Sequence, residues 1–68
     1  MENQMKMPLN IGDVFDVVVD DEGKQGDGIA HIDGVVTFIP EAKKGDLLKI
    51  RIVRLSRRVA FGEIIKEQ

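Results

Sequence analysis

Basic side chains that could bind phosphate are concentrated in the second half of this sequence. Seven bases and the single acid Asp46 lie between Lys43 and Arg58. Residues 1–34 hold eight acids and two bases (net −6), whereas residues 35–68 hold four acids and eight bases (net +4). The formal net charge of −2 therefore does not exclude a polyanionic partner, because attraction to phosphate is local. The alternative is that these bases simply cover a solvated strand face.

Aromatic rings are the second type of group that could contact a nucleic acid, because bases stack on exposed rings. There are only three, Phe15, Phe38 and Phe61. Phe15 alternates with two valines on an apolar strand face, so we expect it in the core. Phe61 is followed by Gly62 and is expected to be partly exposed, beside backbone that a base could approach. One face of this strand would carry Val35, Thr37 and Ile39, and the other Val36 and Phe38. Both are plausible inward sets, so periodicity leaves the direction of Phe38 open.

The candidate phosphate contacts come from a loop, a connector, a strand and a turn. Arg57 and Arg58 are the strongest, because adjacent guanidiniums at a hairpin tip can give bidentate contacts that lysine cannot. His31 could also face a ligand, although a lone histidine is more often an ordinary surface residue. The full set of candidate binding residues is Lys24, His31, Phe38, Lys43, Lys44, Arg51, Arg54, Arg57, Arg58 and Phe61.

Catalytic chemistry is not expected. A single histidine and no cysteine leave carboxylates almost alone to bind a metal, and the acidic run at residues 20–22 is more typical of solvated strand ends. The glycine-rich segment 23–28 lacks the Lys-Ser/Thr pair and the following helix of a P-loop. We therefore predict no catalytic residue, no metal site and no cofactor.

The elements that must position these residues are short strands. Val, Ile and Phe dominate the apolar positions, and Gly and Asp recur about every ten residues, as in strands joined by turns. The pair Asp33-Gly34 between two apolar runs predicts a hairpin with a type I′ turn. Pro40 has no amide hydrogen for a strand ladder and so should end a strand. The expected strands cover residues 14–19, 28–32, 35–39, 47–55 and 59–66.

This pattern predicts an all-β fold, a small five-stranded antiparallel β-barrel formed by residues 11–66, preceded by a flexible segment at residues 1–10. Antiparallel pairing is expected because no helix is available for a crossover. Closure into a barrel would remove exposed strand edges. With neither a signal peptide nor an apolar run of roughly 20 residues, we expect a soluble, cytoplasmic protein.

Several segments together resemble the TRAM domain, a small barrel similar to the oligonucleotide-binding fold. They are Ile-Gly-Asp-Val from Ile11, Gly-Asp-Gly-Ile-Ala at 26–30, Phe-Ile-Pro at 38–40, Gly-Asp at 45–46 and Val-Ala-Phe-Gly-Glu-Ile at 59–64. The chain looks like the stand-alone archaeal members. That resemblance implies RNA binding, tRNA included, and an RNA-chaperone role similar to that of cold-shock proteins.

Two other functions remain open at this point. The chain could deliver tRNA or rRNA to a separate RNA-modifying enzyme, or its basic strand face could dock an acidic protein. If the protein binds RNA, we expect it to be a monomer that binds single-stranded or structured RNA. We expect no contact with a membrane.

Overall fold

The structure, a computed structural model, describes residues 7–66, which form six strands and no helix. The prediction of strands at 28–32, 35–39 and 47–55 is confirmed, while the first and last strands are slightly shorter than predicted. Among these residues no helix could cross a membrane. The strands are β1 Val14–Val18, β2 Asp21–Glu22, β3 Gly28–Ile32, β4 Val35–Ile39, β5 Leu47–Leu55 and β6 Val59–Ile64.

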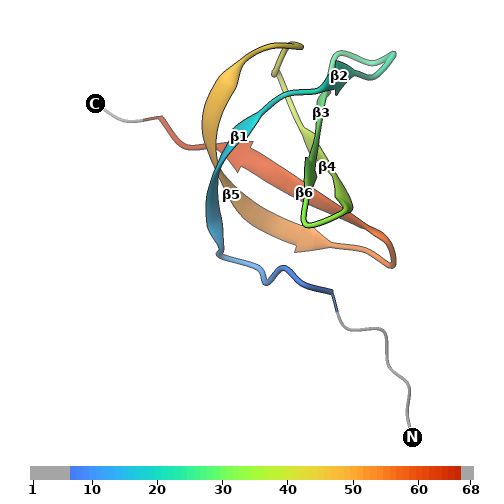
Figure 1. The fold of residues 1–68 in the computed structure, drawn as a ribbon, viewed down its shortest axis with the longest axis vertical. Helices are drawn as coiled ribbons and strands as arrows, with labels where there is room; N and C mark the ends of the chain where they lie inside the picture. Colours follow the sequence, from blue (N-terminus) through green and yellow to red (C-terminus); the bar gives the residue numbers. More distant parts are fainter. Residues whose placement is uncertain (1–6, 67–68) are drawn as a thin grey trace, which may run out of the picture.

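The strands form one curled sheet with the order β1-β5-β6-β4-β3-β2 (Figure 1). Its two edge strands, β1 and β2, follow each other directly in the chain, so the sheet must curl back on itself. The amide of Asp20, between them, donates to the carbonyl of Ile29 at 2.8 Å and ties this corner to β3. The predicted all-β barrel is confirmed, with six strands in place of five because the two-residue β2 was not expected.

Strand pairing differs from the prediction in one place. β4 and β6 pair in parallel, with Phe38 opposite Phe61, whereas the other pairs are antiparallel. The expectation of wholly antiparallel pairing was therefore wrong. The reason is that the chain reverses direction twice between these two strands. The nine-residue β5 runs opposite to β4, and the hairpin after β5 reverses the chain again, so β6 runs in the same direction as β4.

The hairpin between β3 and β4 is confirmed. Asp33 and Gly34 have φ values of 52° and 80°, the positive values that a type I′ turn requires at both central positions. The turn also sets the β3–β4 register, in which Ile29 lies opposite Phe38. Every outward residue on β3 is thereby placed relative to β4.

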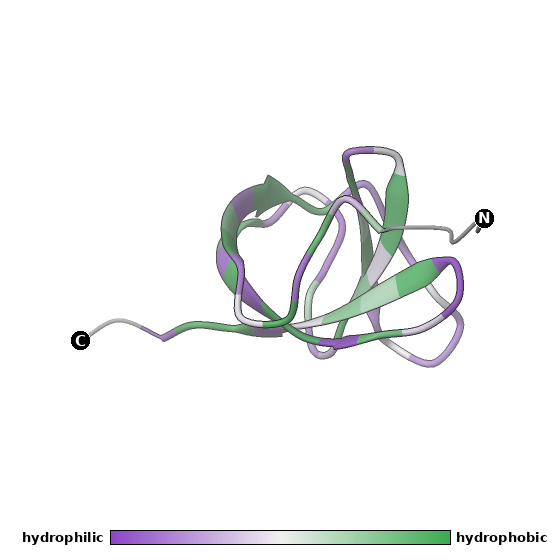
Figure 2. Ribbon diagram, turned by 90° about the horizontal axis from the view of Figure 1, so that it is seen from below, coloured by the Kyte–Doolittle hydropathy of each residue, from purple (hydrophilic) through white to green (hydrophobic). Residues whose placement is uncertain are grey.

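The core is built from the inward faces of the strands. Phe15, Val17 and Val19 point inward as predicted, with Val17 and Val19 buried and Phe15 packed against the core. Hydrophobic residues concentrate along the strands, and hydrophilic ones along most of the connecting loops (Figure 2). The buried apolar residues are Leu9, Val17, Val19, Ala30, Ile32, Val35, Ile39, Ala42, Ile50, Ile52 and Ala60.

Leu9 belongs to this core, with 1% of its surface exposed, although it precedes the predicted domain start at Ile11. Next to it, Asn10 donates its amide to a carboxylate oxygen of Asp13 at 2.9 Å. The flexibility predicted for residues 1–10 stays a prediction, and residues 1–6 lie outside the described residues.

Candidate nucleic-acid interface

Strand alternation in β4 places Phe38 on the outer face of the sheet. Val35, Thr37 and Ile39 are buried, whereas Val36 and Phe38 on the opposite face are only half-buried. Thr37, a polar residue on the inward face, is the reason why the sequence left the direction of Phe38 open. This inward polar side chain satisfies its hydroxyl by donating to the carbonyl of Val35 at 3.2 Å.

Phe38 and Phe61 form a stacked pair on this outer face. The parallel register of β4 and β6 makes them cross-strand partners, and their ring centroids are 5.7 Å apart with an interplanar angle of 28°. Such pairs stabilise a fold by roughly 0.5–1.5 kcal/mol beyond the burial of their surface. Both rings remain partly exposed to solvent.

Arg54 covers the Phe61 ring, with its guanidinium carbon 5.0 Å from the ring centroid. A bulge between Ile52 and Arg54 shifts the β5 register so that Arg54 lies opposite Phe61. The register therefore produces a line of neighbours across four strands, which we call the aromatic row: Ile29, Phe38, Phe61 and Arg54.

Gly62 does not provide the open backbone that the sequence suggested. It is buried, and a Cβ added there would lie 2.9 Å from Cδ1 of Ile50. Glycine is needed at this position because β6 packs closely against the inward side chain of Ile50 on β5. The approach of a base beside Phe61 therefore depends on the ring itself.

Lys24 lies next to the aromatic row. The loop between β2 and β3, residues 23–27, borders a hollow that Phe38 also lines. The loop is closed by backbone bonds from the amide of Gly23 to the carbonyl of Asp27 at 2.8 Å and from the amide of Gly26 to the carbonyl of Gly23 at 3.2 Å. Lys24 is exposed and could reach a phosphate attached to a base on this face.

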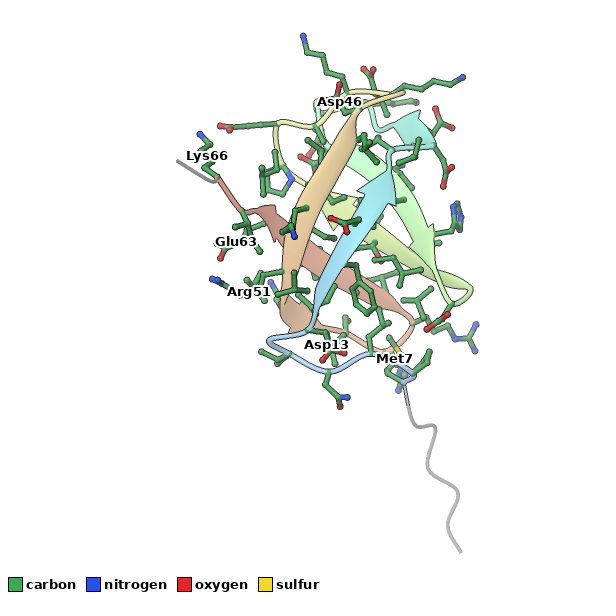
Figure 3. The ribbon with its side chains drawn as sticks, turned by 60° about the vertical axis from the view of Figure 1, so that its left-hand side comes forward. Met7, Asp13, Asp46, Arg51, Glu63 and Lys66 are labelled. Carbon is green, nitrogen blue, oxygen red and sulfur yellow. The ribbon has the colours of Figure 1, made fainter. Side chains whose placement is uncertain are left out.

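The remaining basic candidates lie at two ends of the barrel. Arg57 and Arg58 line a hollow with Met7 and Ser56 at the β5–β6 turn. Lys43 and Lys44 lie at the other end, near Asp46, whose carboxylate accepts the amide of Lys43 at 3.0 Å. Figure 3 shows Met7 and Asp46 at opposite ends of the molecule. These two basic ends are therefore not parts of a single compact site.

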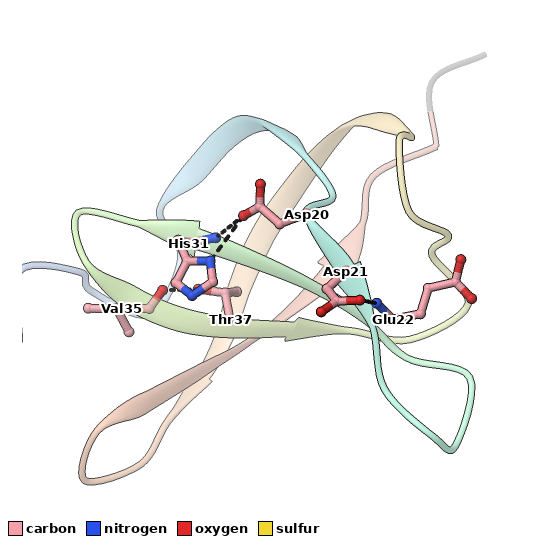
Figure 4. A network of polar contacts seen from close by, with 6 residues as sticks. All are labelled: Asp20, Asp21, Glu22, His31, Val35 and Thr37. Carbon is pink, nitrogen blue, oxygen red and sulfur yellow. Dashed lines mark hydrogen bonds and ion pairs between the residues drawn. The ribbon is translucent and has the colours of Figure 1, made fainter.

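Two candidates already have acidic partners. Arg51 is bonded to Glu63 on β6, with Nη1 3.1 Å from Oε2, and the pair lies on one side of the barrel (Figure 3). His31 lies on the outer face of β3, where Asp20 contacts both its backbone amide at 3.2 Å and its Nδ1 at 3.0 Å (Figure 4). Asp20 thus satisfies the amide of His31, and the Arg51–Glu63 pair leaves less charge available to phosphate.

The sequence did not single out Gln25 and Asp27, which border the hollow beside Phe38. The hairpin between β3 and β4 could have identified Asp27. Once Asp33-Gly34 sets the β3–β4 register, alternation places Asp27 and Ile29 on the face that holds Phe38. The inward residue between them, Gly28, is buried.

Comparison with known proteins agrees with this geometry. The TRAM domain matches residues 8–65. An uncharacterized protein of Methanocaldococcus jannaschii is 36% identical over 64 residues, covering 94% of this chain and 83% of that protein. The solution structure of a conserved protein from Methanococcus maripaludis aligns with a TM-score of 0.83 and 38% identity, over 90% of this chain and 87% of that one.

A larger relative is the ribosomal RNA large subunit methyltransferase E of Methanocella arvoryzae, 45% identical over 60 residues. The match covers 88% of this chain but only 23% of that enzyme. The predicted resemblance to small archaeal TRAM proteins is confirmed by the two relatives of similar length. The chain belongs to the TRAM domain family, whose domain is an RNA-binding module without catalytic activity.

Proposed function

We propose that this protein is a non-catalytic RNA chaperone, a cytoplasmic monomer that binds RNA with little regard to sequence, similar in role to cold-shock proteins. The observation that carries the proposal is the Phe38–Phe61 pair with Arg54 over one ring. Every base has a flat π-face, so a ring-and-guanidinium surface can accept bases of any identity.

The small size of the aromatic surface suits a protein that must release its RNA. Each stacked base contributes roughly 1–3 kcal/mol of binding free energy, and the outer face offers only two rings. Most of the affinity would then come from phosphate contacts. Binding of this kind is modest, weakens with salt and exchanges readily.

Phosphate contacts would extend from the aromatic row toward both ends of the barrel. Lys24 lies beside Phe38, Arg57 and Arg58 lie at the β5–β6 turn, and Lys43 and Lys44 lie at the opposite end. Arg51 and His31 contribute less to binding because Glu63 and Asp20 contact them.

The proposal is tested by fluorescence-anisotropy titration of an oligouridine of about ten nucleotides, within the site size of one small barrel. A tRNA is titrated in parallel, at salt concentrations of about 50 and 200 mM. Binding to both RNAs that weakens with salt supports a general RNA binder. A molecular-beacon hairpin then reports opening of RNA structure, which a chaperone accelerates without ATP. Binding without such opening would leave RNA binding intact and contradict the chaperone role.

A second candidate function is RNA delivery to a separate modifying enzyme. It is favoured by the similarity to about a quarter of an rRNA methyltransferase. A delivery module would bind one folded RNA, such as tRNA or an rRNA fragment, much more tightly than oligouridine. A protein-interaction module would bind neither RNA at low salt.

A further inference from the structure

A hollow of about 320 Å³ lies between the β2–β3 loop and Phe38. Its lining combines one aromatic ring with a lysine, an amide and a carboxylate: Gly23, Lys24, Gln25, Asp27 and Phe38. This volume is at the lower end of the range of small-ligand pockets, so the hollow suits a single flat group. The proposed function uses the outer face of Phe38 but assigns no role to the other side chains here.

The strand register places the Asp27 side chain on the face that carries Phe38. Gly28 points inward, where a Cβ would lie 2.6 Å from that of Ala42, and its neighbours Asp27 and Ile29 therefore point outward. Ile29 is directly opposite Phe38, which makes Asp27 a diagonal neighbour of the ring. Diagonal neighbours on one face lie about 7–8 Å apart, so one base could stack its face on the ring and turn one edge to Asp27.

The carboxylate of Asp27 is available to a ligand. Within residues 7–66 it accepts no hydrogen bond and forms no ion pair. An ionised carboxylate has two acceptor oxygens and no donor, so it selects a ligand that presents donors side by side. Lys24, in the same lining, supplies a positive charge for an anionic group attached to that ligand.

Among the four RNA bases, guanine presents two adjacent N–H donors, N1–H and N2–H, on its Watson–Crick edge. Adenine, cytosine and uracil each present a single donor group there. Unstacked bases in single-stranded RNA are read on this edge while their faces stack on aromatic side chains. A flat base entering the hollow meets the ring of Phe38 with its face and Asp27 with its edge.

We propose that this hollow is a guanine pocket, in which the base stacks on Phe38, the Asp27 carboxylate accepts from N1–H and N2–H, and Lys24 contacts the adjoining phosphate. The pocket rests on the proposed RNA binding. It adds a preference at one nucleotide to contacts that are otherwise tolerant of sequence.

The experiment compares five RNAs of about ten nucleotides: oligouridine, and oligouridine with one central guanine, adenine, cytosine or inosine. Bidentate contacts to a base discriminate by at least about fivefold, so the guanine RNA should bind at least that much more tightly than the other three natural RNAs. Inosine keeps N1–H but lacks the exocyclic amine, and should lose most of the gain. Equal binding by guanine and inosine would overturn the proposal, because the exocyclic amine, and with it the two-donor contact to Asp27, would then contribute nothing to the preference.

The matched variants are Asp27→Asn and Asp33→Asn. Both remove one negative charge with little change in size, and asparagine suits the positive φ of Asp33 in its turn. Asp27→Asn should abolish the preference for guanine while retaining affinity for oligouridine, and Asp33→Asn should leave the preference intact.

The possible failures are distinguishable. If wild-type protein binds oligouridine and the base-substituted RNAs equally, the guanine pocket is wrong and RNA binding stands. If it binds no RNA at low salt, the proposed function itself is wrong. A preference that survives Asp27→Asn would assign guanine recognition to other residues and overturn the pocket as described.

Discussion

Phe38 and Phe61, which lie far apart in the sequence, stack on each other because β4 and β6 run in parallel. This pairing depends on the long β5 strand and its return hairpin. Without the parallel pairing of β4 and β6, the two rings would not be cross-strand neighbours. The largest aromatic surface among the described residues is thus a product of topology.

The first prediction concerns these rings. Phe38→Leu and Phe61→Leu retain apolar packing but remove the flat surface, so each should weaken oligouridine binding by about 1–3 kcal/mol. Phe15→Leu is the matched control, because that ring faces the core. It should lower the free energy of unfolding, by about 1 kcal/mol, and leave RNA affinity unchanged in anisotropy titrations. Similar losses of affinity in all three variants would argue against a specific role for the outer rings.

Arg54 is expected to act through its planar guanidinium. Arg54→Lys preserves the charge but weakens the contact over Phe61, so affinity should fall while its dependence on salt is retained. Arg51→Lys serves as the control, since the guanidinium of Arg51 is bonded to the carboxylate of Glu63. Titrations at two salt concentrations separate the effects. An Arg54→Lys protein with wild-type affinity would contradict stacking at this position.

The turn that carries Arg57 and Arg58 should contribute through contacts with phosphate. Replacing both by alanine should reduce the slope of log affinity against log salt by about 1.4, if each neutralises one phosphate of a single strand. The slope is measured with oligouridine over a salt series. The double substitution Lys43→Ala/Lys44→Ala tests the opposite end of the barrel in the same way. An unchanged slope would remove the corresponding end from the RNA path.

Gly28 is predicted to be essential for stability. A Cβ at this position would lie 2.6 Å from the Cβ of Ala42 and 3.0 Å from Cγ1 of Val19, where little adjustment is possible. Gly28→Ala should therefore lower the free energy of unfolding by about 1–3 kcal/mol in urea titrations. Gly23→Ala is the control, because its Cβ would meet its nearest neighbour only at 3.8 Å. Equal stability of both variants would contradict the packing of β3 against the connector after β4.

Local patterns in the sequence were sufficient for much of the fold. The Asp33-Gly34 turn, the end of β4 before Pro40 and the inward side of Phe15 all depend on neighbouring residues, and the structure confirms them. The parallel β4–β6 pair could not be predicted in this way, because it depends on where β5 directs the chain.

The candidate site was harder to predict for a related reason. Both faces of β4 are largely apolar, so the outward direction of Phe38 follows only from the closed sheet. The bulge that aligns Arg54 with Phe61 is likewise a property of paired strands. Charge alone could not distinguish Arg51, held by Glu63, from Arg54, which lies over a ring.

The most direct test of RNA binding at the aromatic row is an NMR titration of isotopically labelled protein with oligouridine, following backbone amides and phenylalanine ring protons. The account predicts that the largest shifts occur at Phe38, Phe61 and the β2–β3 loop, with small shifts at Val14 and Val18 on the outer side of β1. Shifts centred on β1, or no shifts at low salt, would contradict it.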